Sequence, residues 1–291
     1  MILVTGGTGF VGRNLIEELL KGRGVRCLVR HPERGFPLSG VELVRGDVTD
    51  KRSVLGAMGG VDAVVHLVGI LMESKGSAFR AVHVEGTRNV VEACGESGVA
   101  RYIHVSALGT RPFARSEYHR TKWEAEEAVR ASSLDYTIFR PSVIFGKEDK
   151  FTNLFARAMR LSPVIMIPGD GRNKMQPVFV KDLARAMSDS IDMAAAGKAT
   201  FEAAGPEIYT FDEIIDSIAA VLNKSPFKLH VPMSLMRLNA ALLETVLPRP
   251  PITRDALLML EEDNVTADNA LINVFGIKPT GFMEGMRTYL H

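Results

Sequence analysis

Residues 5–12 read Thr5-Gly6-Gly7-Thr8-Gly9-Phe10-Val11-Gly12 and follow a short apolar run at the start of the chain. Apolar residues then recur at helical spacing, at Val11, Leu15, Ile16, Leu19 and Leu20. A strand, a glycine turn and a helix in this order typically hold the diphosphate of a dinucleotide. Gly6 permits the tight turn, Gly9 lets backbone N–H groups approach a ligand, and Gly12 lets the helix pack on its strand. The stretch therefore predicts a diphosphate site at a helix N-terminus.

Strand-like and helix-like segments alternate through the first half of the chain. The strand-like segments lie near residues 1–5, 24–30, 41–45, 61–67, 100–105 and 134–140. This alternation predicts an α/β fold with a Rossmann-type, doubly wound parallel sheet. We expect a dinucleotide-binding domain over residues 1–145, to which parts of 177–205 return. Residues 146–291 would form a smaller mixed lobe over the carboxyl edge of the sheet.

Composition excludes several function classes. The chain has 291 residues, and its 35 Lys+Arg balance 34 Asp+Glu, so no broad basic surface favours nucleic acid. Cys27 and Cys94 lie among apolar residues and are expected to be small buried hydrophobes. His66, His104 and His119 show no metal-ligand spacing and are expected to be hydrogen-bonded inside the fold, so no metal site is predicted.

The chain also shows no targeting or membrane-spanning pattern. The first strand begins at Met1, and no apolar run approaches the roughly 18 residues of a spanning helix. We therefore expect a cytoplasmic protein without a transmembrane segment.

Two arginines indicate which dinucleotide is bound. The end of the second strand carries Arg30 where an NAD site has an acidic residue, and Arg34 is nearby. Cations here suit a 2′-phosphate, which favours NADP(H). After the third strand, Asp47 either accepts a hydrogen bond from the adenine amino group, with Val48 beside it, or is a helix N-cap.

The residues of the reacting end follow later in the chain. Tyr118 and Lys122 are four apart in a predicted helix over 117–129, so both project from one face. A neighbouring ammonium would lower the pKa of the phenol toward that of a usable acid or base. Ser106 follows the fifth strand and could hold a substrate oxygen beside the phenol.

Together these residues resemble the short-chain dehydrogenase/reductase superfamily, in particular its extended or atypical, epimerase/dehydratase-like branches. Within it, residues 64–71, 106–109 and 145–146 look like proteins similar to the NADPH-binding accessory subunit of respiratory complex I. The resemblance implies hydride chemistry at a nicotinamide. It also implies cofactor contacts at Gly6, Thr8, Gly9, Phe10, Val11, Arg30, Asp47, Leu67, Val68, Gly69, Tyr118, Lys122, Pro141, Ser142 and Val143.

One residue departs from the superfamily pattern. His83 lies where an asparagine usually helps to position a water or the lysine, so the proton relay differs. The first hypothesis is an NADP(H)-dependent oxidoreductase acting on a small carbonyl, hydroxyl or quinone-like compound. The second is a non-catalytic NADPH-holding scaffold, assembly factor or redox sensor. A third is a sugar-nucleotide epimerase or dehydratase, which Arg30 disfavours because those enzymes usually retain NAD.

A helix near residues 233–247 carries much apolar surface. Burial against the sheet or in a homodimer explains this most simply. The alternatives are a wall for a lipophilic substrate or peripheral contact with a membrane surface.

Overall fold

The computed structural model describes residues 1–74, 77–247 and 250–290. The chain forms two compact units, which we describe separately. Unit 1 comprises Met1–Arg140 and Leu183–Phe201, and unit 2 comprises Pro141–Asp182 and Glu202–His291.

Unit 1 is built on a parallel sheet, which confirms the predicted doubly wound α/β fold. The described strands form a seven-stranded sheet in the order β11-β6-β5-β4-β1-β2-β3. Pairing from β3 through β6 is parallel throughout. The strand bounds are β1 Ile2–Thr5, β2 Val25–Val29, β3 Val41–Arg45, β4 Ala63–His66, β5 Arg101–Val105, β6 Asp135–Pro141 and β11 Ala199–Ala203.

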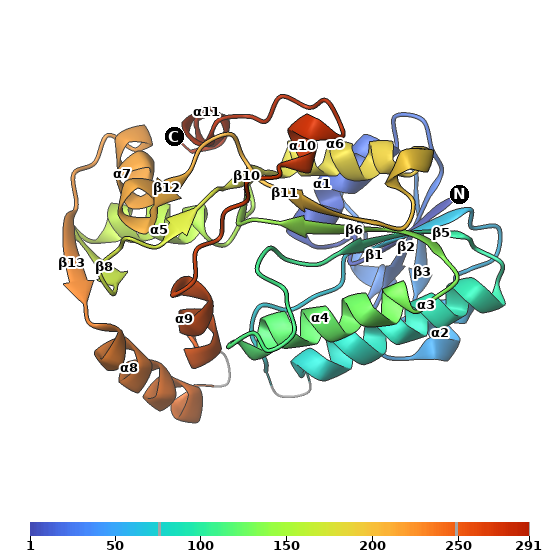
Figure 1. The fold of residues 1–291 in the computed structure, drawn as a ribbon, viewed down its shortest axis with the longest axis horizontal. Coiled ribbons are helices and arrows are strands. Elements are labelled where there is room, and N and C mark those ends of the chain that lie inside the picture. The colour runs from blue at the N-terminus through green and yellow to red at the C-terminus, as the bar shows by residue number, and fades with distance from the viewer. Residues whose placement is uncertain (75–76, 248–249, 291) are drawn as a thin grey trace. The chain divides into compact units, whose positions relative to one another are not determined.

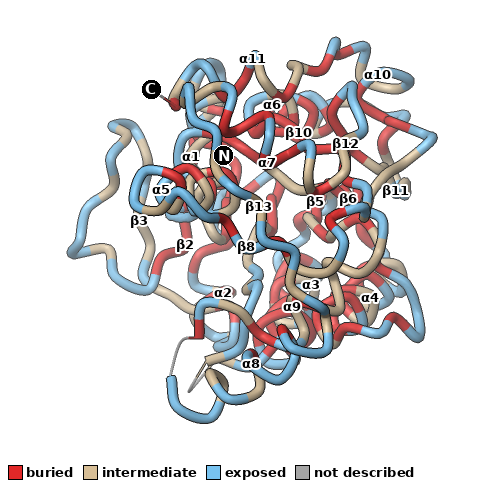
Figure 2. The backbone as a smooth tube through the Cα atoms, turned by 90° about the vertical axis from the view of Figure 1, so that its left-hand side faces the viewer, coloured by how far each residue is buried: buried red, intermediate tan, exposed pale blue. Residues whose placement is uncertain are grey.

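Helices cover both faces of this sheet. Figure 1 shows α2 (Lys51–Gly56), α3 (Gly86–Glu96) and α4 (Glu117–Arg130) on one face, with α1 (Phe10–Leu19) and α6 (Val180–Ser190) on the other. Buried residues follow the strands and the inward helix faces (Figure 2). A π-helix, Arg80–Glu85 (η2), directly precedes α3, so this helical segment begins irregularly.

The described residues of unit 2 form a separate core and three small sheets. The strands are β7 Ile144–Phe145, β8 Val164–Pro168, β9 Lys174–Met175, β10 Val178–Phe179, β12 Tyr209–Thr210 and β13 Phe227–Val231. The helices are α5 Thr152–Leu161, α7 Phe211–Val221, α8 Met233–Val246, α9 Arg254–Leu260, α10 Ala270–Asn273 and α11 Phe282–Arg287. Phe145, Phe179, Phe211 and Phe282 belong to its core cluster.

Two features of unit 2 bear on how its sequence is interpreted. The turn at residues 168–171 does not connect two paired strands, because β8 pairs in parallel with β13 while β9 pairs with β12. Within this chain, helix α8 does not bury most of its apolar side chains, since Met236 and Ala240 are its buried residues, while burial in a homodimer stays a prediction. Its outer face exposes Leu235, Leu238, Leu242 and Val246, and much of α8 is pale blue or tan in Figure 2.

The expectation for the two cysteines is confirmed. Cys27 and Cys94 are buried free thiols, and burial raises their pKa to about 11 and about 12. In the described ranges, no helix has both the length and the apolar character needed to cross a bilayer.

Candidate functional site

The glycine turn forms an open cradle at the start of α1. Gly6 has φ +79°, and a methyl group added at Gly12 would lie 2.4 Å from the Gly6 carbonyl oxygen, so only glycine fits there. Thr8 and Gly9 are exposed. Helix α1 has no side-chain N-cap and no acidic residue in its first turn. Its first amides therefore suit a diphosphate at the positive end of the helix dipole.

The loop after β4 lies directly against this turn. A methyl group on Gly6 would lie 3.0 Å from the Leu67 carbonyl carbon and from the Val68 nitrogen. One on Gly69 would lie 3.1 Å from Lys122 Nζ. Unit 1 thus brings Gly6, Leu67, Val68, Gly69 and Lys122 to the carboxyl edge of the sheet, where α/β folds bind ligands.

Lys122 is a buried ammonium. Its Nζ donates to the Val105 carbonyl at 2.9 Å, at the end of β5. Burial lowers the pKa of Lys122 to about 8, an effect that the Glu126 charge opposes in part. No carboxylate of the described chain forms an ion pair with it, since buried Glu126 pairs instead with Arg130 and Arg140. The site is therefore electropositive at neutral pH.

Tyr118 lies one helical turn earlier on α4 and is also buried. Its ring packs edge-on against His83 and Phe79, at centroid distances of 5.5 and 6.0 Å. Burial raises the pKa of Tyr118 to about 12. The predicted net lowering of this pKa is not found, because desolvation of the phenolate outweighs the effect of the Lys122 charge in this structure. The phenol keeps its proton at neutral pH.

Ser106 follows β5 directly. Its side chain is buried, and its hydroxyl donates to Thr110 Oγ1 at 3.3 Å. Its backbone N–H is held by the Phe139 carbonyl of β6. The Ser106 hydroxyl is therefore held near the end of β5, where the Val105 carbonyl accepts from Lys122.

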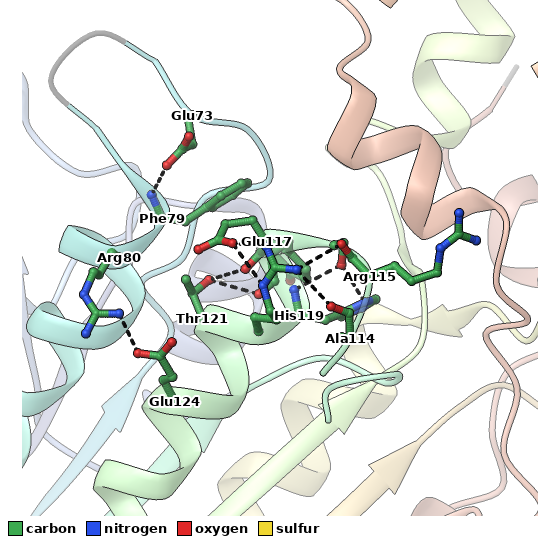
Figure 3. Close-up of polar contacts among 12 residues, drawn as sticks. Glu73, Phe79, Arg80, Ala114, Arg115, Glu117, His119, Thr121 and Glu124 are labelled. Carbon is green, nitrogen blue, oxygen red and sulfur yellow. Dashed lines mark hydrogen bonds and ion pairs between the residues drawn. The ribbon is translucent and has the colours of Figure 1, made fainter. Parts of the chain in front are cut away.

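His83 connects the loop after β4 to α4. Its Nε2 accepts the Ile70 N–H at 3.0 Å, and its Nδ1 lies 2.9 Å from Thr121 Oγ1. With Nδ1 protonated, the ring donates to Thr121, whose hydroxyl donates to first-turn carbonyls of α4 (Figure 3). Burial, then the Lys122 charge, lowers the pKa of His83 to about 2, so the ring stays neutral.

The sequence did not reveal the role of Thr121. Its position directly before Lys122 and three residues after Tyr118 was the available signal. His83 itself lies in the π-helical turn η2, a feature that is frequent at functional sites. The departure from asparagine therefore places a neutral hydrogen-bonding ring between the cofactor loop and the tyrosine helix.

Arg30 and Arg34 lie where the sequence predicts them, exposed after β2. The nearby Glu33 carboxylate is 2.9 Å from both His31 Nδ1 and Arg45 Nη2. Within the described ranges, no hydrogen bond or ion pair holds the side chain of Arg30 or Arg34. Both guanidinium groups are therefore available to an anion.

Asp47 is not a helix N-cap, which corrects one of its two sequence interpretations. Asp50 caps α2 by accepting from the Arg52 N–H. Asp47 Oδ1 instead accepts from the Thr49 N–H and hydroxyl at 2.9 and 2.8 Å. Val48 is buried against Gly86 at the start of α3, so it anchors the loop in the core.

Pro141, Ser142 and Val143 belong to unit 2, whereas the other predicted contacts belong to unit 1. Ser142 Oγ donates to Asn264 Oδ1 at 2.6 Å, and the Val143 N–H donates to the same oxygen at 3.2 Å. Hydrogen bonds to Asn264, a residue of the same unit, therefore hold residues 142–143 in place.

The other buried histidines differ from one another. His66 hydrogen-bonds to the hydroxyls of Thr5 and Thr87, and His119 lies 3.0 Å from Ser116 Oγ, as predicted. The prediction is wrong for His104, because neither ring nitrogen finds a partner in the described chain. In the part of the chain that the structure describes, no group of His, Cys, Asp or Glu side chains is arranged to hold a metal ion.

Comparison with known proteins now identifies the family. Residues 6–161 match the NAD(P)H-binding family. The chain belongs to that family. Residues 109–232 also match the RmlD substrate binding domain. The NAD(P)H-binding family match supports the predicted nicotinamide cofactor and does not distinguish NADP from NAD.

Relatives extend over most of the chain. It is 30% identical to the mitochondrial NADH dehydrogenase [ubiquinone] 1 alpha subcomplex subunit 9 of Arabidopsis thaliana, covering 92% of this chain and 71% of that one. It is 31% identical to a ceramide reductase of Caulobacter vibrioides, covering 80% and 74%. The chain is thus a Rossmann protein related both to a complex I subunit and to a reductase.

The fold matches solved epimerase structures. UDP-glucose 4-epimerase of Thermus thermophilus, solved with NAD, superposes with a TM-score of 0.76 at 22% identity, covering 99% of this chain and 97% of that one. This likeness confirms the Rossmann-type fold.

Proposed function

We propose that this protein is an NADP(H)-dependent reductase of a carbonyl compound. The observation that carries the proposal is the buried Lys122 ammonium, held at the end of β5 beside Gly69 and one turn after the buried Tyr118. Lys122, Tyr118 and Ser106 form the reacting group, and the loop at 67–69 joins them to the glycine turn.

The protonation state of Tyr118 suits the acid step of a carbonyl reduction. Because the pKa of Tyr118 is about 12, its phenol is an acid that holds a proton for a carbonyl oxygen. Use as a base at pH 7 would cost about 7 kcal/mol at 1.36 kcal/mol per pKa unit. When bound at the glycine turn, NADPH would supply the hydride for such a reduction. Tyr118 gives its proton to the oxygen, Ser106 orients that oxygen, and Lys122 stabilises the phenolate until solvent reprotonates it.

Arg30 and Arg34 support NADP(H) over NAD(H). Each is exposed, and Glu33, the acidic residue beside them, is already engaged by Arg45 and His31. Charge-assisted hydrogen bonds from guanidinium to a 2′-phosphate contribute about 1.5–3 kcal/mol each. The remaining contacts are proposed at Gly6, Thr8–Val11, Asp47, Val48, Leu67–Gly69 and Pro141–Val143.

A second function has support in the relatives. The Arabidopsis relative is named as a subunit of NADH dehydrogenase, and a subunit can retain NADPH without turnover. The test is NADPH oxidation by the purified protein across aldehydes, ketones and quinones. We expect turnover that falls at least about a hundredfold in Tyr118→Phe, since general acid catalysis contributes about 10²–10⁴. If the protein bound NADPH at micromolar concentration and oxidised it with none of these compounds, the non-catalytic NADPH-holding scaffold would replace the reductase as the proposed function.

A further inference from the structure

Two loops of unit 1 carry most of its strongly exposed apolar side chains. Apart from Met1, those in its described residues are Leu71, Met72 and Phe113, which are 57, 39 and 95% exposed. Leu71 and Met72 follow β4, and Phe113 follows β5. Because β4 and β5 are parallel neighbours, both loops leave the sheet at its carboxyl edge. The same edge carries Lys122 and Gly69.

Phe113 is held outward against its backbone preference. Its φ of +61° lies in the left-handed region, which residues with a Cβ rarely adopt. The 95% exposure shows that no packing of the ring compensates for this conformation. The flanking chain is instead well fixed, because Ala114 is buried and Ser116 caps α4. A strained residue that presents its side chain to solvent indicates a functional position.

The loop around Phe113 is basic. Residues 106–116 include Arg111 and Arg115 and contain no acidic residue. Both arginines are exposed, and Arg111 Nη1 donates to the Gly109 carbonyl at 2.9 Å. In Figure 3 the Arg115 side chain extends away from the first-turn contacts of α4. An aromatic tip between arginines is the composition of a segment that lies at the interface of an anionic bilayer.

We propose that this edge docks onto an anionic lipid bilayer, with the Phe113 ring inserted among the headgroups and with Arg111 and Arg115 beside lipid phosphates. Leu71 and Met72 widen the apolar contact. The substrate class, which rests on the proposed reductase function, is a lipid carbonyl compound that reaches Tyr118 from the bilayer. A single protruding ring with flanking cations suits a lipid interface better than a protein partner, which would require a broad complementary surface.

The first test measures vesicle binding. The protein should cosediment with phosphatidylcholine vesicles that contain phosphatidylglycerol and bind weakly to phosphatidylcholine alone. Phe113→Gly should lower this affinity by about tenfold or more, since the ring supplies the inserted apolar surface. Glycine also relieves the positive φ, so this variant should unfold at an unchanged or higher temperature. Ile272→Ser, which alters a side chain of unit 2 that is 52% exposed, is the matched control and should bind like the parent.

The second test locates the ring. The chain has one tryptophan, Trp123, so Phe113→Trp adds a second emission. We expect a blue shift of the added emission with anionic vesicles and quenching by brominated lipid. Absence of vesicle binding, equal binding by Phe113→Gly, or an unquenched emission would overturn the docking surface, whether or not the protein reduces carbonyls.

The substrate class is tested with a long-chain aldehyde in vesicles and a short water-soluble aldehyde. Phe113→Gly should lower the ratio of vesicle-borne to soluble turnover by about tenfold, following the loss of binding. An unchanged ratio would overturn the lipid substrate. Vesicle binding through Phe113 without NADPH oxidation on any aldehyde would overturn the proposed function and leave the docking surface standing.

Discussion

Replacing His83 tests the connection between the cofactor loop and the catalytic helix. His83→Leu removes the acceptor of the Ile70 N–H and the partner of Thr121 Oγ1, which lie at 3.0 and 2.9 Å. Leaving a buried polar group without its partner costs about 1–3 kcal/mol. Thr121 keeps its donation to the first-turn carbonyls of α4 and loses only the contact with the ring, and the Ile70 N–H loses its acceptor. At about 1 kcal/mol for each lost contact, the sum is about 2 kcal/mol.

The assay is urea unfolding followed by fluorescence of Trp123, which lies in α4 next to Lys122. We expect His83→Leu to lower the free energy of unfolding by about 2 kcal/mol and to weaken NADPH binding severalfold as the loop at 67–70 loosens. Combined with Thr121→Val, the double-mutant cycle should give a coupling energy of about 1 kcal/mol, while Thr121→Ser, which keeps the hydroxyl, serves as the control. Unchanged stability, or additive effects of the two substitutions, would refute this assignment.

Three further outcomes follow from the site. Calorimetry should show NADPH binding at least about tenfold tighter than NADH, a difference of about 1.4 kcal/mol that Arg30→Asp erases; equal affinities in the parent would contradict the NADP assignment. The pKa of Lys122 is lowered to about 8, so its side chain is an ammonium below that pH. The affinity for NADPH should therefore be constant below about pH 8 and fall above it, and Lys122→Met should show no such fall. An affinity of the unmodified protein that does not change with pH would contradict this role. Gly12→Ala should abolish cofactor binding because its methyl group would meet the Gly6 carbonyl at 2.4 Å; retained binding measured by fluorescence titration would exclude the cradle.

The sequence predicted unit 1 well because its signals are local. The glycine pattern at 6–12 and the alternating apolar runs are each set by a few consecutive residues, and the structure places β1–β6 within one or two residues of them. Tyr118 and Lys122 were predictable for the same reason, since their spacing on one helix is a local property.

What the sequence could not supply depends on burial and on distant partners. The pKa of Tyr118 rises because the fold desolvates the phenol, and spacing alone suggested the opposite direction. Asp47 and Asp50 are both plausible helix caps by type, and backbone geometry chose Asp50. The His83–Thr121 contact joins residues 38 apart, and the outward Phe113 depends on a backbone angle that no residue pattern encodes.

The most direct test of the central claim is transfer of deuterium from NADPH labelled at the transferable C4 position to an aldehyde substrate, followed by mass spectrometry of the product. If Tyr118 and Lys122 form a reductive site, the alcohol carries one deuterium on the former carbonyl carbon, and its formation slows at least about a hundredfold in Tyr118→Phe. Tight binding of the labelled cofactor with no deuterated alcohol would contradict the claim, and so would a labelled product formed equally fast by Tyr118→Phe.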